Sequence, residues 1–173
     1  MKKALNHISK NVFIAIAVIV GFAAVVTAAF LLSPECTTAA EREARINKFK
    51  SGFVVSSETE IDGHIISSAY SGDQICLTVF EPEGKGYKLV TNAYRPIDDI
   101  LILSAPVNGI NYDFCWYNGK NITSAQVTYT DADGKQSSSV YDVKDNCIVV
   151  SESPDGNYTV SVSYTDTDGN VFE

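Results

Sequence analysis

One unbroken apolar run constrains this chain more than any other feature, because it covers residues 12–32 without a single charged side chain. These 21 residues would span roughly 31 Å as a helix, which matches the hydrocarbon core of a bilayer. Thirteen of them are Val, Ile, Leu or Phe, and such residues favour membrane insertion. We therefore expect residues 12–32 to form a transmembrane helix.

The charges on either side of this run predict its orientation. Residues 1–11 carry three lysines and no acid, whereas all 21 acids of the chain follow the run. Lysines next to a membrane span stay on the cytoplasmic side. We therefore expect residues 1–11 to be a cytoplasmic basic tail, and the chain to be a single-pass protein of the cell membrane with its C-terminal domain extracytoplasmic.

The apolar run has two alternative interpretations. A cleaved signal peptide would use the small residues around Ala28, but residues 30–32 continue the run, which is longer than the 7–15 residues of a signal core. Lipid attachment would use Cys36, but Glu35 stands where a lipoprotein signal has a small residue. The composition therefore favours a retained anchor.

A polar segment, residues 33–52, separates the run from the rest of the chain. Thr38 and Glu41 have the spacing of a capping box, and Gly52 is a candidate stop signal. This pattern predicts a helix over residues 38–50. Because its apolar face is thin, we expect a juxtamembrane stalk that spaces the domain from the bilayer.

Residues 53–173 are rich in β-formers interrupted by turn signals, as in a β-sandwich. Their number suffices for one sandwich core but not for two domains. The cleanest strand alternates Tyr and Val with Thr and Ser over residues 158–165. The predicted strands cover residues 53–57, 64–68, 75–80, 87–92, 100–104, 112–117, 125–130, 138–143, 147–151 and 158–165.

The only tryptophan, Trp116, lies in one of these predicted strands. It alternates in phase with Phe114, while Asp113 is in the opposite phase, so we expect Trp116 to point into the core. Asn118-Gly119 follows directly and is a strong two-residue hairpin signal. It predicts that residues 125–130 pair with this strand.

The final segment, GNYTVSVSYTDTDGNVFE, carries a resemblance to a known type of module. It resembles the closing strands of immunoglobulin-like modules on bacterial surface proteins, where a Tyr–Val strand runs into an Asp-x-Asp-Gly turn. The layout of basic tail, anchor and acidic β-domain is similar to uncharacterised membrane-anchored proteins of Gram-positive bacteria. The resemblance implies an immunoglobulin-like β-sandwich outside the membrane and no particular activity. The chain departs from immunoglobulin domains in the spacing of Cys76, Trp116 and Cys147.

The cysteines are candidates for a disulfide, because exported domains face an oxidising environment. Cys76, Cys115 and Cys147 lie in the predicted domain, and a bridge among them competes with buried free thiols as the interpretation. Cys36, next to the membrane, could instead join two chains. The chain has no Cys-x-x-Cys motif.

Motifs for catalysis or metal binding are lacking. The only histidines are His7 and His64, so we expect no catalytic residues, no cofactor and no His-rich metal site. Residues 131–134 and 166–169 both read Asp-x-Asp-Gly, but Val140 stands where a calcium loop of the EF type needs its glutamate. Hairpin turns are the better interpretation, with a looser calcium site as the alternative.

Aromatic residues give the only candidate binding side chains. Tyr94 and Tyr117 could contact a glycan or protein ligand, although half-buried strand tyrosines are more usual. Residues 51–173 contain 18 acids and 6 bases, which argues against nucleic acid as a partner.

These observations predict a binding or scaffolding module held outside the membrane, and not an enzyme. One alternative is a pilin-like filament subunit, although residues 12–32 lack the glutamate that pilin helices usually carry. A small extracytoplasmic enzyme is the remaining alternative.

Overall fold

Residues 35–173 are the part of the chain that the structure, a computed structural model, describes. The predicted basic tail and transmembrane helix, residues 1–11 and 12–32, lie outside it. Within the described part, no helix is both long enough and apolar enough to cross a bilayer. The elements are α2 (Ala39–Phe49), β1 (Val54–Ile61), β2 (His64–Tyr70), β3 (Gln74–Glu83), β4 (Gly86–Pro96), β5 (Ile100–Val107), β6 (Ile110–Tyr117), β7 (Ile122–Asp131), β8 (Gln136–Asp142), β9 (Val149–Glu152), β10 (Tyr158–Asp166) and β11 (Val171–Phe172).

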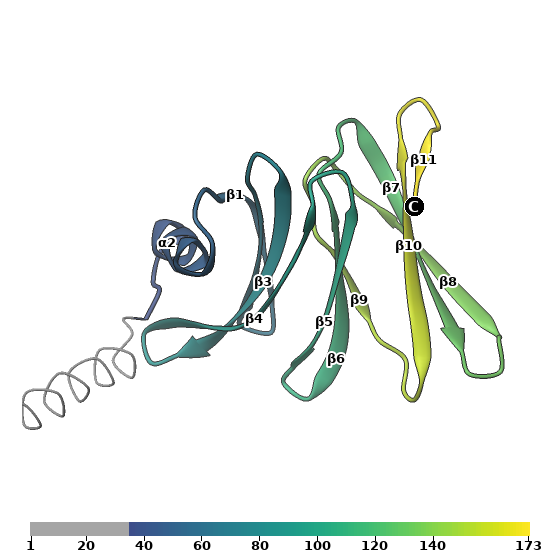
Figure 1. Ribbon diagram of the computed structural model, residues 1–173. Coiled ribbons are helices and arrows are strands. Elements are labelled where there is room, and N and C mark those ends of the chain that lie inside the picture. The colour runs from purple at the N-terminus through teal and green to yellow at the C-terminus, as the bar shows by residue number, and fades with distance from the viewer. Residues whose placement is uncertain (1–34) are drawn as a thin grey trace, which may run out of the picture. The chain divides into compact units, whose positions relative to one another are not determined.

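The strands form three antiparallel sheets (Figure 1). Sheet A has the order β1-β2-β3-β4, sheet B the order β5-β6-β9, and sheet C the order β11-β10-β7-β8. All ten predicted strands are present, most of them longer than predicted. The prediction of an all-β domain is therefore confirmed. The domain has three sheets, however, and not the two sheets of a single sandwich.

Sheet B is the central layer, and it has a hydrophobic core on each face. Its first face packs on sheet A through side chains that include Leu77, Leu101 and Trp116. Its second face packs on sheet C through side chains that include Cys115 and Tyr164. A third cluster fills the space between α2 and the other face of sheet A. Sheets A and B are therefore covered on both faces, which the expectation of a single sandwich core did not include.

Strand β6 shows this double burial most clearly. Phe114 and Trp116 are fully buried in the core shared with sheet A, which confirms the inward orientation predicted for Trp116. Asp113 and Cys115 point the opposite way and are also fully buried. The acid does not mark a solvent-facing side, because the second face of β6 is covered by sheet C.

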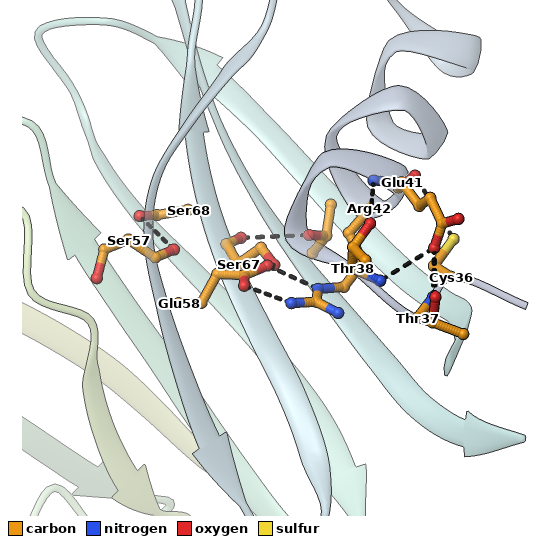
Figure 2. Close-up of polar contacts among 10 residues, drawn as sticks. Cys36, Thr37, Thr38, Glu41, Arg42, Ser57, Glu58, Ser67 and Ser68 are labelled. Atoms are coloured by element: carbon orange, nitrogen blue, oxygen red, sulfur yellow. Dashed lines mark hydrogen bonds and ion pairs between the residues drawn. The ribbon is translucent and has the colours of Figure 1, made fainter. Parts of the chain in front are cut away.

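Helix α2 is held on sheet A by an ion pair between a buried arginine and a partly buried glutamate. Arg42 is 6% exposed, and its Nε and Nη2 donate to Oε1 and Oε2 of Glu58 on β1 at 2.8 and 2.6 Å (Figure 2). The Ser67 hydroxyl donates to the same carboxylate at 2.6 Å. The Arg42 guanidinium also lies 5.5 Å from the centre of the Tyr87 ring. The Glu58 carboxylate thus accepts three hydrogen bonds from within the fold, and this cluster docks α2 on sheet A.

The predicted capping box is present at the start of α2. The Thr38 side chain accepts from the backbone N–H of Glu41, and the Glu41 carboxylate accepts from the backbone N–H of Thr38 at 3.0 Å. Ile46 on the same helix is fully buried. The folded unit starts at Glu35, so the helix is part of the domain. This differs from the predicted division into a stalk, residues 33–52, and a domain, residues 53–173.

The connection between β6 and β7 corrects a predicted hairpin. Residues 118–121 lead from sheet B to sheet C, so β7 does not pair with β6. Gly119 does not have a positive φ. A Cβ at this position would lie 2.3 Å from the Tyr117 ring. The glycine is therefore needed for close packing against that ring, which the dipeptide signal could not reveal.

Two hairpins with positive φ at both loop residues lie elsewhere. Asp62-Gly63 joins β1 to β2, and Asn108-Gly109 joins β5 to β6, with positive φ at all four residues. Asp-Gly and Asn-Gly are the preferred dipeptides of such turns. The connections after β6, β8 and β9 each change sheet, so sheets B and C are interleaved along the chain.

Candidate binding site

A hollow of about 240 Å³ opens where the β7–β8 hairpin meets the loop between β9 and β10. Strands β7 and β10 are paired, and their register sets Tyr158 opposite Asp131. This pairing brings together two loops that are far apart in the sequence. The lining residues are Tyr129, Asp131, Lys135, Gln136, Ser137, Pro154, Asp155, Asn157 and Tyr158.

The turn on one side of the hollow is held by its own aspartate. Asp131 Oδ1 accepts from the backbone N–H groups of Asp133 and Lys135 at 3.0 and 2.9 Å, and Gly134 has a φ of +81°. Residues 166–170 repeat this turn, with Asp166 accepting from the N–H groups of Asp168 and Asn170. Both Asp-x-Asp-Gly segments are therefore hairpin turns, as predicted.

Two tyrosine rings line the hollow. The rings of Tyr129 and Tyr158 are 5.4 Å apart and meet edge to face at 84°. Tyr129 is 8% exposed, whereas Tyr158 is half-buried. Burial raises the pKa of Tyr129. Tyr129 is therefore uncharged at neutral pH. The half-buried Tyr158 ring is the aromatic surface of the hollow that is more open to a ligand.

A buried carboxylate lies behind these rings. Asp113 is fully buried and accepts hydrogen bonds from the hydroxyls of Ser104, Ser153 and Tyr158, the last two at 2.8 and 3.3 Å. Among the described residues it has no ion pair. Buried carboxylates need such donors to offset lost hydration. The cluster fixes Tyr158, and with it one wall of the hollow.

The rim of the hollow is polar and slightly acidic. The rim contains two carboxylates, Asp131 and Asp155, and one cation, Lys135. The side-chain amides of Gln136 and Asn157 add hydrogen-bond donors and acceptors. An aromatic ring beside amides and carboxylates suits a neutral polyhydroxylated ligand, since hydroxyls both donate and accept hydrogen bonds. Anionic ligands are disfavoured by the charge.

The aromatic residues predicted to bind do not lie in this hollow. Tyr94 packs against Phe53 at 5.6 Å, in the cluster beneath α2. Tyr117 packs against Tyr164 and Phe172 at 5.6 and 5.1 Å, in the core between sheets B and C. The two tyrosines thus belong to different layers and form no common platform.

Sequence reasoning missed Tyr129 and Tyr158 as candidate site residues. Both lie in predicted strands, Tyr129 just before the turn of residues 131–134 and Tyr158 just after the turn signal Pro154-Asp155-Gly156. Only the pairing of β7 with β10 shows that those turns share one end of the sheet.

All four cysteines carry free thiols in the structure. Cys76 lies in the cluster beneath α2, and Cys115 lies in the core between sheets B and C. Burial raises the pKa of each of these two thiols to about 12. Both are therefore protonated at neutral pH and serve as small apolar side chains. Cys147 is partly exposed and Cys36 is buried.

Among residues 35–173, no group of three or more His, Cys, Asp or Glu side chains is arranged to hold a metal ion. His64 is the first residue of β2 and is buried. No family model, curated protein or solved structure matches this chain.

Proposed function

We propose that this chain is a single-pass membrane protein that presents a β-sandwich binding module outside the cell membrane. The apolar run of residues 12–32 and the lysines before it support the anchor and its orientation. The acidic composition of the following residues suits an exported domain and disfavours nucleic acid. No reaction is proposed.

We further propose that residues 100–172 form an immunoglobulin-like sandwich. Immunoglobulin domains hold strands A, B and E in one sheet and C, F and G in the other, with C′ beside C in variable-type domains. Naming β5 to β11 as A, B, C, C′, E, F and G gives the same division between sheets B and C, with strand D absent. Sheet A and α2 then form an additional layer on the A-B-E sheet.

The ligand class follows from the hollow between the β7–β8 hairpin and the β9–β10 loop. The observation that carries the proposal is the Tyr129–Tyr158 pair beneath a rim of amides and carboxylates. We propose that the hollow binds a saccharide unit of a cell-surface or extracellular glycan. Its volume of about 240 Å³ lies below the range of about 300–1,000 Å³ for pockets that hold drug-sized ligands, which favours a single small ring over an extended polymer.

Saccharide titration of the full chain tests this proposal. The chain should be kept in a detergent without a sugar headgroup and titrated with a panel of neutral and charged saccharides by calorimetry. We expect a neutral saccharide to bind, and Asn157→Ala to weaken its binding about tenfold, which equals about 1.4 kcal/mol. Asn111→Ala removes an exposed amide outside the hollow and should bind as the wild type does. Absence of binding across the panel, or equal affinities for the two variants, would contradict the proposal.

A further inference from the structure

Strand β8 forms an open edge of sheet C. The sheet order is β11-β10-β7-β8, so β8 has one neighbour, β7, and Figure 1 shows nothing beyond it. Its pairing with β7 runs from Ser124↔Asp142 to Thr130↔Gln136 without a register shift. Six of its seven residues are exposed. The edge is therefore straight, seven residues long and accessible.

Two backbone hydrogen bonds identify which groups of this edge are free. Asp131 N–H donates to Lys135 O, and Val143 N–H donates to Thr123 O, both at 3.0 Å. In an antiparallel ladder such pairs alternate with pairs that make no bond between the two strands. The residues whose N–H and C=O groups point away from β7 are therefore Gln136, Ser138, Val140 and Asp142.

The other sheet edges of the described chain are short, interrupted or partly covered. A bulge interrupts the β1–β2 pairing, and Val55 N–H of β1 donates to Glu43 of α2. The outer side of β4 pairs with Cys36 at Tyr87. Strand β9 has four residues and β11 has two, and β11 pairs with β10 at Tyr164 and Thr165. Strand β5 contains Pro106, which cannot donate.

Strand β8 has none of these features. It contains no proline, no lysine and no bulge, and its only charged residue is Asp142 at the end. Val140 is 69% exposed, the highest value among the large apolar residues described. Natural proteins normally block an edge of this kind, because it offers a template for another strand.

We propose that β8 pairs antiparallel with β8 of a second copy of this chain, about a two-fold axis at Ser139. Gln136 then lies opposite the partner's Asp142, and Ser138 lies opposite the partner's Val140. In this register all four outward-pointing residues form hydrogen-bonded pairs, so every free backbone group of the edge is satisfied. The two copies of sheet C join into one eight-stranded sheet.

The edge is complementary to itself in side chains as well as in backbone. Residues 136–141 carry no charge, so no like charges oppose each other, and the Gln136 amide can donate to the partner's Asp142 carboxylate. On the same face of the joined sheet, the Val140 side chain lies beside the side chain of the partner's Ser138. Because the two-fold pairing uses the same edge of both copies, it closes at two copies and does not continue into a filament.

Cysteine crosslinking of the full chain tests this register. Ser139→Cys places a thiol on the two-fold axis, opposite its own copy. Ser137→Cys lies on the same strand, but opposite the partner's Tyr141 and about 13 Å from the partner's own residue 137. In detergent and mild oxidant, Ser139→Cys should form covalent dimers at least tenfold faster than Ser137→Cys, and the wild type gives the background from its native thiols.

A second measurement follows the strength of association. Light scattering of the detergent-solubilised full chain should give a dimer that dissociates on dilution. Val140→Pro removes one outward N–H and should raise the dissociation constant at least tenfold while leaving the melting temperature within a few degrees. Val140→Lys, which keeps the backbone intact, provides the same test if the proline variant does not fold.

Equal crosslinking of the two cysteine variants would overturn the proposal, as would a wild-type chain that stays monomeric at all concentrations. A wild-type dimer that both Val140 variants leave unchanged would also overturn it.

Discussion

Two carboxylates, the fully buried Asp113 and the partly buried Glu58, illustrate how single residues hold this domain together. Asp113 is satisfied by three hydroxyls, whereas Glu58 is satisfied by a guanidinium and a hydroxyl. Burial by itself raises the pKa of Glu58, but the hydrogen bonds from Arg42 and Ser67 and the charge of Arg42 outweigh it. The pKa of Glu58 therefore lies below its ordinary value of 4.5. Its ionised form is the one that the folded state stabilises.

This shift predicts an acid-dependent loss of stability. A carboxyl group with a lowered pKa binds more protons in the unfolded state, so its contribution is complete above about pH 5 and falls as pH drops below 4.5. The denaturant midpoint of the wild type should therefore fall from pH 5 to pH 3 more steeply than that of Glu58→Gln. At pH 7, Glu58→Gln should cost roughly 3 kcal/mol of unfolding free energy, because Arg42 loses its counter-charge.

The matched control for this prediction is Glu60→Gln, an exposed acid on the same strand. Glu60→Gln should have the same unfolding free energy as the wild type at pH 7, and its denaturant midpoint should depend on pH as that of the wild type does. Parallel pH profiles for the wild type and Glu58→Gln would show that the ion pair does not dock α2.

At the scale of elements, the hairpin turns of sheet C depend on glycines in a left-handed conformation. Gly134 and Gly169 have φ values of +81° and +83°, and a Cβ at either position would meet nothing within 4 Å. A side chain at either position would therefore destabilise the domain through backbone strain and not through a steric clash. A β-branched residue at positive φ is strained by about 1–3 kcal/mol.

We therefore expect Gly134→Val and Gly169→Val each to lower the unfolding free energy by about 1–3 kcal/mol in chemical denaturation. Gly72→Val is the control, because Gly72 also has open space around it but no positive φ. A change for Gly72→Val as large as for the other two would show that the turn conformation is not the cause.

The elements that the sequence predicted well are those whose signal is local. The capping box of Thr38 and Glu41 depends on one helical turn, and the alternation of residues 158–165 depends on one strand, so both could be read directly. The β6–β7 connection could not, since the same Asn-Gly dipeptide suits a hairpin and a crossing between sheets. Whether a strand is covered on one face or on two depends on distant segments, so the sequence did not show that Asp113 is buried.

The candidate site was even less predictable than the fold. Tyr129 and Tyr158 are ordinary strand tyrosines in the sequence, and only the register of β7 with β10 brings their turns together. Tyr94 and Tyr117 were equally plausible by type, but each contributes to a different core.

At the scale of the whole molecule, the boundary of the folded unit makes a direct prediction. A fragment of residues 35–173 should be soluble without detergent and should melt cooperatively, because it retains α2 and all three sheets. A fragment of residues 53–173 lacks α2 and exposes Phe80, Ala69 and Cys76 on the outer face of sheet A. It should melt at a lower temperature and bind a hydrophobic dye. The full chain should require detergent.

Calorimetry and dye binding on the three proteins would check this prediction. Equal melting temperatures for the two fragments would show that α2 adds nothing to the domain. Partition of the full chain into the aqueous phase would contradict the membrane anchor.

The central position of sheet B also limits how this sequence can diverge. Every residue of β6 from Asp113 to Trp116 is fully buried. A substitution on either face of this strand therefore has to fit against a neighbouring sheet, and neither face is exposed to solvent. The outer face of sheet C has no such neighbour. In relatives of this chain, substitutions should accumulate from the centre outward, and the middle strand should keep its identity longest.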